Sequence, residues 1–224
     1  MNSASNNGKN KVTIAAAGGI TTILSAMDNL SSNANVQHFG CGALRNLAYN
    51  NDNNKVMVAA AGGIPMILSA MKTHLSNANV QENGCGALMR LALNINNEVM
   101  IAEAGGITTI LSSIKTHFSN ADVQEYGCEA LWNLAFNDNN KVAIEAAGSI
   151  TTILSVMKTH SSNANVQYYG CGVLWNLALD NDNNKAAIAD ACGKSAIESA
   201  MRNHLSNASV QEKGNGALRI FIQH

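Results

Sequence analysis

The sequence predicts an all-α solenoid of about five repeats, each with three helices. One segment occurs five times, and its copies start 44, 43, 43 and 44 residues apart. A fixed period of this length is typical of stacked helical units rather than of a globule with one active site. The copies are VQHFGCGALRNLA from Val36, VQENGCGALMRLA from Val80, VQEYGCEALWNLA from Val123, VQYYGCGVLWNLA from Val166 and VQEKGNGALRIFI from Val210.

A second segment with the same period supports one continuous domain. AAAGGITTILSAM near Ala15 returns in each later unit, with a more divergent copy, ADACGKSAIESAM, near Ala189. Five units fill the 224 residues and leave no room for a linker or a second domain. We therefore expect a single repeat domain over 1–224, with repeats at about 10–51, 52–95, 96–138, 139–181 and 182–224.

Composition argues against nucleic acid and membrane partners. The net charge is -1, from 14 basic and 15 acidic residues, so nothing attracts a phosphate backbone or an anionic membrane. No apolar run approaches the roughly 18 residues that a membrane-spanning helix needs, and MNSASNNGKNK is too polar for a signal peptide. We expect no membrane insertion and a cytoplasmic or nuclear location.

The first two helices of a repeat are predicted from the third unit. NEVMIAEAG forms a short helix that ends at Gly105 and Gly106, where glycine supplies a left-handed cap. GITTILSSIKTH then forms an amphipathic helix, because its apolar residues recur at helical spacing. These residues are Ile107, Ile110, Leu111 and Ile114.

The third helix begins after Asn120 or Asp122, either of which can act as its N-cap, and is predicted to run to about Asn137. Its buried stripe includes Gly127, and a glycine inside a helix costs about 1 kcal/mol relative to alanine. The same glycine recurs in every unit, which indicates close helix approach at that level. The rest of the stripe is Val123, Ala130, Leu131, Leu134 and Ala135.

The opposite face of the third helix carries the candidate binding site. Both tryptophans and all four tyrosines of the chain lie on this face. Aromatic rings with polar tips beside amides are typical of protein-binding hot spots, although Trp132 and Trp175 can instead pack between neighbouring third helices. The candidate peptide-binding residues are Arg45, Asn46, Arg90, Glu125, Tyr126, Glu129, Trp132, Asn133, Tyr168, Tyr169, Trp175 and Asn176.

Charges on this face are mixed, with an acidic middle and basic ends. A segment with a basic or aromatic centre would suit repeats three and four, and an ordinary solvated surface is the alternative. The acidic residues are Glu82, Glu125, Glu129 and Glu212, and the basic residues are Arg45, Arg90, Lys213 and Arg219.

The order of short helix, Gly-Gly, longer helix and VQxxGCxALWNLA resembles the armadillo repeat from about Asn10 to His224. The AGGI turn and the NLA ending distinguish it from two-helix repeats. The resemblance implies a right-handed superhelix whose third helices line a concave groove, and a peptide-binding role for the asparagine in NLA. The matching residues are Asn46, Asn133 and Asn176, whereas Arg90 and Ile220 interrupt the series.

Within that family the chain is less similar to importin-alpha-like proteins, which carry a tryptophan four residues before the asparagine. The local order Leu-Trp-Asn-Leu is more similar to catenin and vacuolar armadillo proteins, which are scaffolds. The positions where importin-alpha-like proteins have tryptophan hold Gly42, Gly86, Glu129, Gly172 and Gly216.

No catalytic residue, metal site or cofactor is predicted. The recurring histidines lie on helices about 10 Å apart, too far to share one ion, and a helix-end histidine complements the helix dipole. The recurring cysteines are likewise too far apart for disulfides and are expected to be reduced core residues. These residues are His74, His117, His160 and His204, and Cys41, Cys85, Cys128 and Cys171.

The predicted function is a non-enzymatic scaffold that binds an extended segment of another protein. The apolar ending Ile220, Phe221 and Ile222 leaves a second possibility open, because a solenoid exposes apolar faces at uncapped ends. In that alternative the chain is a structural segment that self-associates end to end, a part of a longer array, or a consensus-like repeat protein without a specific partner.

Overall fold

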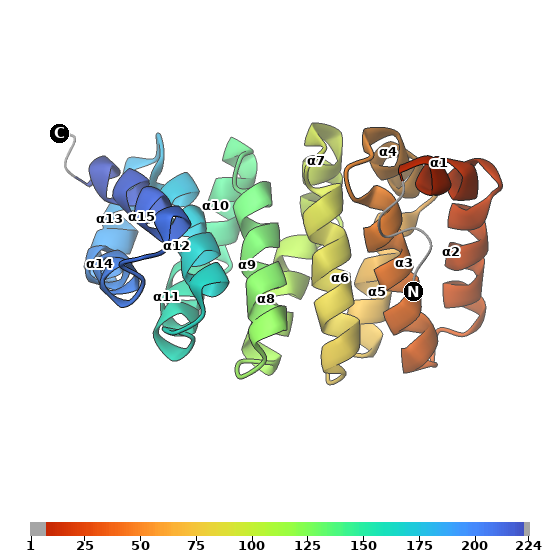
Figure 1. Cartoon of the computed structure of the whole chain (residues 1–224), viewed down its shortest axis with the longest axis horizontal. Helices are drawn as coiled ribbons and strands as arrows, with labels where there is room; N and C mark the ends of the chain where they lie inside the picture. Colours follow the sequence, from red (N-terminus) through yellow and green to blue (C-terminus); the bar gives the residue numbers. More distant parts are fainter. Residues whose placement is uncertain (1–7, 222–224) are drawn as a thin grey trace.

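The computed structural model describes residues 8–221, and all regular secondary structure in this range is α-helical (Figure 1). Three helices form each repeat, which confirms the predicted solenoid of about five repeats. The helices are α1 (Gly8–Ala16), α2 (Gly19–Asn29), α3 (Ala34–Ala48), α4 (Asp52–Ala60), α5 (Gly63–Thr73), α6 (Ala78–Leu91), α7 (Ile95–Glu103), α8 (Gly106–Thr116), α9 (Ala121–Leu134), α10 (Asp138–Ala146), α11 (Ser149–Thr159), α12 (Ala164–Ala178), α13 (Asp182–Asp190), α14 (Gly193–Asn203) and α15 (Ala208–Ile220).

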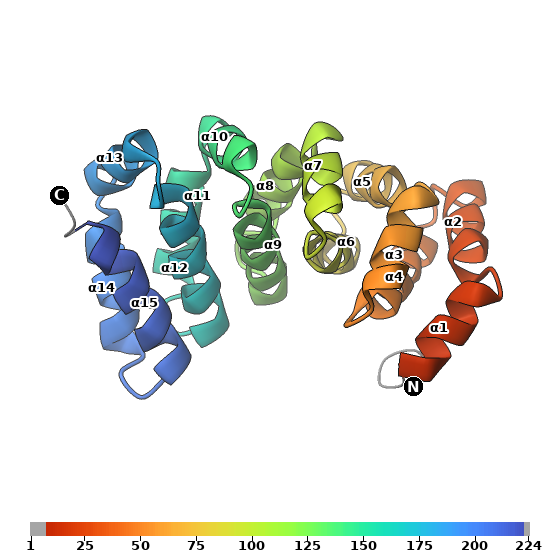
Figure 2. The same cartoon turned by 90° about the horizontal axis from the view of Figure 1, so that it is seen from above.

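The repeats form an arc with the third helices along its inner side (Figure 2). The third helices α3, α6, α9, α12 and α15 pack on one another in chain order, more extensively than the second helices do. Side chains two repeats apart meet on this side: Arg45 of α3 reaches Tyr126 of α9, and Lys213 of α15 reaches Trp132 of α9. Such contacts require the helices to converge, so the inner side is concave.

Glycine and asparagine define the helix boundaries inside each repeat. Gly105 has a φ of 81° and joins α7 to α8, as the Gly-Gly turn predicts. Asn120 is the N-cap of α9, because its side chain accepts hydrogen bonds from the backbone N–H groups of Asp122 and Val123. The helix ends at Leu134, earlier than predicted, since Asn137 is already the N-cap of α10.

The difference between the 43-residue and 44-residue repeat spacings arises where a third helix meets the next repeat. After α3 and α12 the chain contains one extra residue, which adopts a left-handed conformation: φ is 50° at Asn50 and 54° at Asp180. Asparagine and aspartate tolerate this conformation better than most residues. The longer period therefore reflects a turn residue and leaves the helix stack unchanged.

The recurring glycine inside the third helix permits close contact with the second helix. A Cβ atom at Gly170 would lie 2.6 Å from Cγ of Met157, and one at Gly127 would lie 2.7 Å from Cγ1 of Ile114. Both distances are too short for real atoms, so only glycine fits without rearrangement. The predicted close helix approach is confirmed.

A buried asparagine in the first helix joins consecutive repeats. Asn97 is 2% exposed, and its Nδ2 donates to the backbone oxygens of Leu91 at 3.1 Å and of Lys55 at 3.3 Å. The first bond gives a carbonyl at the end of α6 a second donor beside the backbone N–H of Asn94, and the second bond reaches the preceding repeat. Asn54 and Asn140 make the same pair of bonds.

The recurring histidines also join repeats. His117 is the C-cap residue of α8, in keeping with the expected helix-end position, and its Nε2 lies 2.6 Å from the backbone oxygen of Leu75 in the preceding repeat. Equivalent bonds are made by His74 to Ser31, His160 to Phe118 and His204 to Ser161. The repeated histidine is therefore an inter-repeat hydrogen-bonding group.

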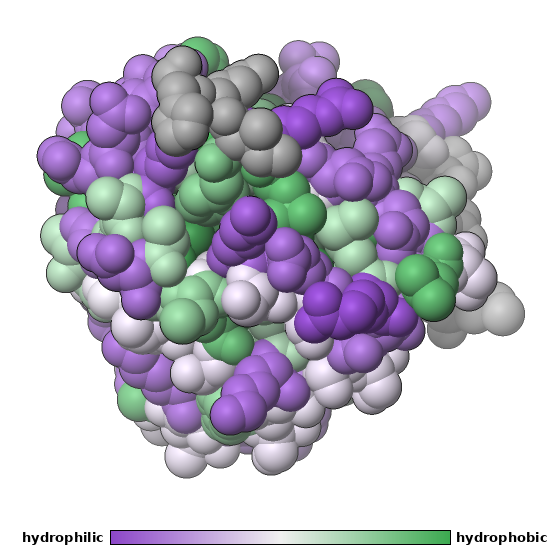
Figure 3. Space-filling model, turned by 90° about the vertical axis from the view of Figure 1, so that its left-hand side faces the viewer, coloured by the Kyte–Doolittle hydropathy of each residue, from purple (hydrophilic) through white to green (hydrophobic). Residues whose placement is uncertain are grey.

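The C-terminal end of the stack is partly hydrophilic. At the C-terminal end, Lys194 and Glu198 replace the isoleucine and leucine of earlier second helices, and hydrophilic residues interrupt the hydrophobic ones across this face (Figure 3). Ile220 and Phe221 are partly buried against the core, and Ile222 lies outside the described residues.

Among the helices of residues 8–221, none is by itself long and apolar enough to cross a membrane. One bent pair, α4 with α5, meets that test by length and composition only.

Replacing Asn97 with alanine should destabilise the junction between α6 and α7. The substitution removes two buried hydrogen bonds, one to Leu91 and one to Lys55, and each contributes about 0.5 to 1.5 kcal/mol. Chemical denaturation should show this loss, and amide hydrogen exchange should accelerate at the junction. Asn96→Ala is the matched control, because that side chain is exposed. Equal stability of the two variants would contradict a structural role for the buried amide.

The cysteines should differ sharply in reactivity. Cys41, Cys85, Cys128 and Cys171 are buried, and desolvation raises the pKa of each thiol to about 12, whereas Cys192 is exposed. At pH 8 the buried thiols stay protonated, and only a thiolate reacts readily. A colourimetric thiol reagent should therefore detect one cysteine in the folded protein and all five after denaturation. Rapid reaction of several thiols in the folded protein would show that the core opens.

Candidate functional site

The candidate residues lie on the third helices, and the arginines and aromatic residues among them form two clusters on the inner side of the arc. The first cluster, here called the cation cluster, joins Arg45 and Arg90 to rings and a carboxylate. The second, here called the aromatic cluster, contains Trp132, Tyr168 and Trp175 from α9 and α12. Tyr169 and Glu129 connect the two clusters, because Tyr169 contacts Trp132 and its phenol interacts with the Glu129 carboxylate, which in turn lies near Arg90.

In the cation cluster, Arg45 crosses the whole second repeat. Its Nη2 donates to the Tyr126 hydroxyl at 2.7 Å, and its guanidinium carbon lies 4.2 Å from the Tyr126 ring centroid. A Cβ atom at Gly86 would lie 2.8 Å from Cδ of Arg45. Glycine at 86 thus leaves the space through which the arginine passes.

Arg90 is held by an acid and a ring. Its Nη1 lies 3.9 Å from Oε1 of Glu129, and its guanidinium carbon lies 4.8 Å from the Tyr49 ring centroid. Lys11 contacts the same ring at 4.5 Å and donates to the Tyr49 backbone oxygen at 2.7 Å. Lys11 and Tyr49 were not among the candidate residues. Tyr49 lies on the aromatic face of the third helix, but nothing in the pattern indicates that Lys11 of α1 reaches it.

Burial changes the ionisation of the groups between the clusters. Desolvation raises the pKa of Glu129, and the charge of Arg90 partly opposes this shift. The pKa of Tyr169 is raised well above its usual range by desolvation and by the neighbouring Glu129 carboxylate. Desolvation also raises the pKa of Glu82. The acidic middle predicted from the sequence is thus partly enclosed rather than fully solvated.

Two of the candidate asparagines hydrogen-bond within the chain. Asn133 is 2% exposed and its Nδ2 donates to the Met89 backbone oxygen at 3.0 Å, while Asn176 donates to the Trp132 backbone oxygen at 3.3 Å. Each bond reaches the preceding third helix. Asn46 is only half-buried. In this structure Asn133 and Asn176 therefore join neighbouring third helices.

The aromatic cluster is ordered by contacts among its own rings. Trp132 lies 5.8 Å from Tyr168 and 5.9 Å from Tyr169, centroid to centroid, and 5.8 Å from Phe136. Such tilted and edge-to-face pairs are favourable arrangements for aromatic rings. The tryptophans are partly buried against the core, whereas Phe136 is 60% exposed. The inner side of the cluster is therefore packed against the core, and its outer side is open.

Glycines support the tryptophans from below. A Cβ atom at Gly172 would lie 3.2 Å from the Trp132 indole, and one at Gly216 would collide with the ring of Trp175. Each indole therefore rests on the backbone of the next third helix. Both tryptophans thus come from the repeat that precedes the glycine on which each indole rests.

Lys213 is placed against the aromatic cluster. Its Nζ lies 4.4 Å from the Trp132 ring centroid and 5.1 Å from those of Tyr168 and Trp175. The sequence places Lys213 on the inner face, but its proximity to a ring two repeats away depends on the curvature of the stack.

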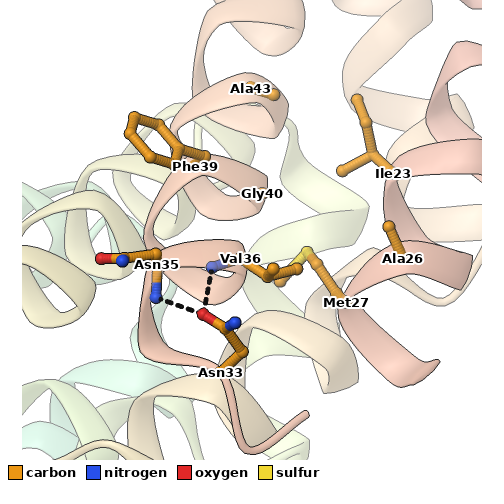
Figure 4. A pocket seen from close by; sticks show the side chains of 9 residues that line it. All are labelled: Ile23, Ala26, Met27, Asn33, Asn35, Val36, Phe39, Gly40 and Ala43. Carbon is orange, nitrogen blue, oxygen red and sulfur yellow. Dashed lines mark hydrogen bonds between the residues drawn. The ribbon is translucent and has the colours of Figure 1, made fainter. Parts of the chain in front are cut away.

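A separate apolar cleft of about 360 Å³ lies at the N-terminal end, between α2 and α3 (Figure 4). Ile23 and Ala43, which line it, are partly exposed, whereas the equivalent Ile67 and Ala87 of the second repeat are fully buried. In the later repeats the equivalent face is covered, because it packs on the preceding repeat. The remaining lining residues are Ala26, Met27, Asn33, Asn35, Val36, Phe39 and Gly40.

The family described as LRRK2 ARM repeat matches residues 61–221, which is more than half of the chain. The chain belongs to this armadillo repeat family. The armadillo assignment made from the Gly-Gly turn and the NLA ending is therefore confirmed, and the solenoid is of the armadillo type.

Solved armadillo structures share the fold at low sequence identity. An engineered protein superposes with a TM-score of 0.86 at 23% identity, covering 98% of this chain and 85% of that one. A designed armadillo repeat protein in complex with the peptide (KR)4 gives 0.83 at 19% identity, covering 97% and 88%. A structure concerning the interaction between cadherin and beta-catenin gives 0.60 at 18% identity, covering 98% and 48%. No curated protein matches the chain.

Proposed function

We propose that this armadillo repeat chain is a non-enzymatic binding module whose concave side holds an extended segment of another protein. The observation that carries the proposal is the partly exposed aromatic cluster at the centre of the inner face. Aromatic rings that are fixed in position but open on one side are typical energetic centres of protein interfaces. Binding of the peptide (KR)4 by a designed armadillo protein supports the same use of this fold.

The geometry refines which groups would contact the bound segment. Phe136 and the outer edges of Trp132 and Trp175 are available, whereas Asn133 and Asn176 already hydrogen-bond within the chain. Arg45, Arg90 and Lys213 are each engaged by aromatic rings. We therefore assign recognition chiefly to aromatic contacts in repeats three and four. The proposal also includes a cytoplasmic or nuclear location, no nucleic acid partner and no membrane insertion.

Self-association is the second candidate function, and the apolar N-terminal cleft favours it. The cleft presents the surface that mediates repeat-to-repeat packing elsewhere in the chain. A second copy would cover Ile23 and Phe39, which is 70% exposed. Sedimentation velocity at increasing concentration separates the candidates, because a peptide-binding module without self-association stays monomeric.

Phe136→Ala should weaken peptide binding without unfolding the protein. A library of displayed peptides is selected on the wild-type chain, and the affinities of the selected peptides are then measured by calorimetry. Loss of an exposed hot-spot ring should reduce affinity by about tenfold, which corresponds to roughly 1.4 kcal/mol. The matched control is Phe118→Ala, because Phe118 lies on the α8–α9 connection, away from the inner face. Equal effects of the two substitutions would contradict the proposed groove.

A further inference from the structure

The aromatic cluster has the geometry of a binding site for a cation, and the chain fills this site itself. The rings of Trp132, Tyr168 and Trp175 surround Nζ of Lys213 at 4.4 to 5.1 Å. All three distances lie within the roughly 6 Å at which a ring face attracts a positive charge. The rings come from α9 and α12 and the lysine from α15, so three repeats meet here.

The rings are the main partners of this ammonium group. No carboxylate in residues 8–221 lies within ion-pair distance of Lys213, and its neighbour Glu212 acts only through its more distant charge. Desolvation lowers the pKa of Lys213, which agrees with an ammonium partly withdrawn from water among the rings. A primary ammonium carries three N–H donors, and aromatic faces satisfy these donors poorly.

The cage does not depend on the lysine for its shape. Gly172 and Gly216 support the two indoles from below, and Tyr169 and Phe136 contact Trp132 from the side. The fold does not require lysine at position 213 either, because the equivalent residues in earlier repeats are Phe39, Asn83, Tyr126 and Tyr169. Removing the lysine side chain should therefore leave a preformed cage.

We propose that the Trp132–Tyr168–Trp175 cage binds a quaternary ammonium group, such as a trimethylated lysine of the bound segment, and that Lys213 is an internal competitor for this site. This inference rests on the proposed function and names the ligand chemistry of its central site.

A competing ligand must bind the rings better than Lys213, which is tethered beside them and so has a high effective concentration. An unmodified lysine offers the same ammonium group and has no such advantage. A trimethylated ammonium keeps its charge, carries no N–H donors that need acceptors, and is recognised by aromatic cages. The chemistry of the cage therefore favours the methylated cation.

The test uses tetramethylammonium chloride as the probe and intrinsic tryptophan fluorescence as the signal. Both tryptophans of the chain belong to the cage, so the signal reports the site directly. Lys213→Ala should bind the probe saturably and at least about tenfold more tightly than wild type, at matched ionic strength. Arg219→Ala is the control, since it removes the same charge from α15 at an exposed position outside the cage. Lys213→Asn, which copies Asn83 of the second repeat, guards against misfolding of the alanine variant.

A second titration separates methylated from unmodified lysine. N-acetyl-trimethyllysine amide should compete with tetramethylammonium on Lys213→Ala, and N-acetyl-lysine amide should compete at least about fivefold less well. Equal competition by the two compounds, or responses of both Lys213 variants that match wild type, would overturn the proposal. If the cage fails these tests while Phe136→Ala still weakens peptide binding, the proposed function stands without it. If the Lys213 variants bind the cations as expected but Phe136→Ala leaves peptide affinity unchanged, the cation site stands and the proposed function is contradicted.

Discussion

The close packing of each third helix on its neighbours is the constraint on which the rest of the structure depends. It is permitted by glycines at two levels of the third helix. At one level, glycines such as Gly170 face the second helix of the same repeat, and at the other, Gly86, Gly172 and Gly216 face side chains of the preceding repeat. A larger residue at either level would separate the helices or displace the side chain above it. Curvature, inner-face contacts and cage geometry all follow from this packing.

The same constraint determines the chemistry of the concave side. Because the helices converge, long side chains reach residues two repeats away, and Arg45 and Lys213 find aromatic rings there. Cations that would otherwise project into solvent are therefore held against tyrosine and tryptophan. The buried amides and the histidines hold consecutive repeats in register through hydrogen bonds. The stacking of the repeats therefore determines where these rings lie.

Much of this architecture could be predicted from the sequence, because period and helical spacing are local properties. The three helices, the turn at Gly105 and the aromatic face of the third helix are of this kind. The N-cap of α9 could not be decided, since Asn120 and Asp122 are both good caps. The pairing of Arg45 with Tyr126 and the engagement of Asn133 with Met89 depend on superhelical curvature, which no single repeat encodes. The recurring histidines were interpreted from helix-end chemistry alone. Their hydrogen bonds to the preceding repeat could not be predicted, because they depend on how the repeats stack.

Proton NMR of Lys213 tests most directly whether the third helices converge this far. The ring faces of Trp132, Tyr168 and Trp175 surround its ammonium end, so ring currents should shift the ε-methylene signal well upfield of an exposed lysine. Nuclear Overhauser contacts to the Trp132 indole should accompany the shift. An ordinary lysine chemical shift without indole contacts would show that repeats three and five do not meet across repeat four, and would contradict the account.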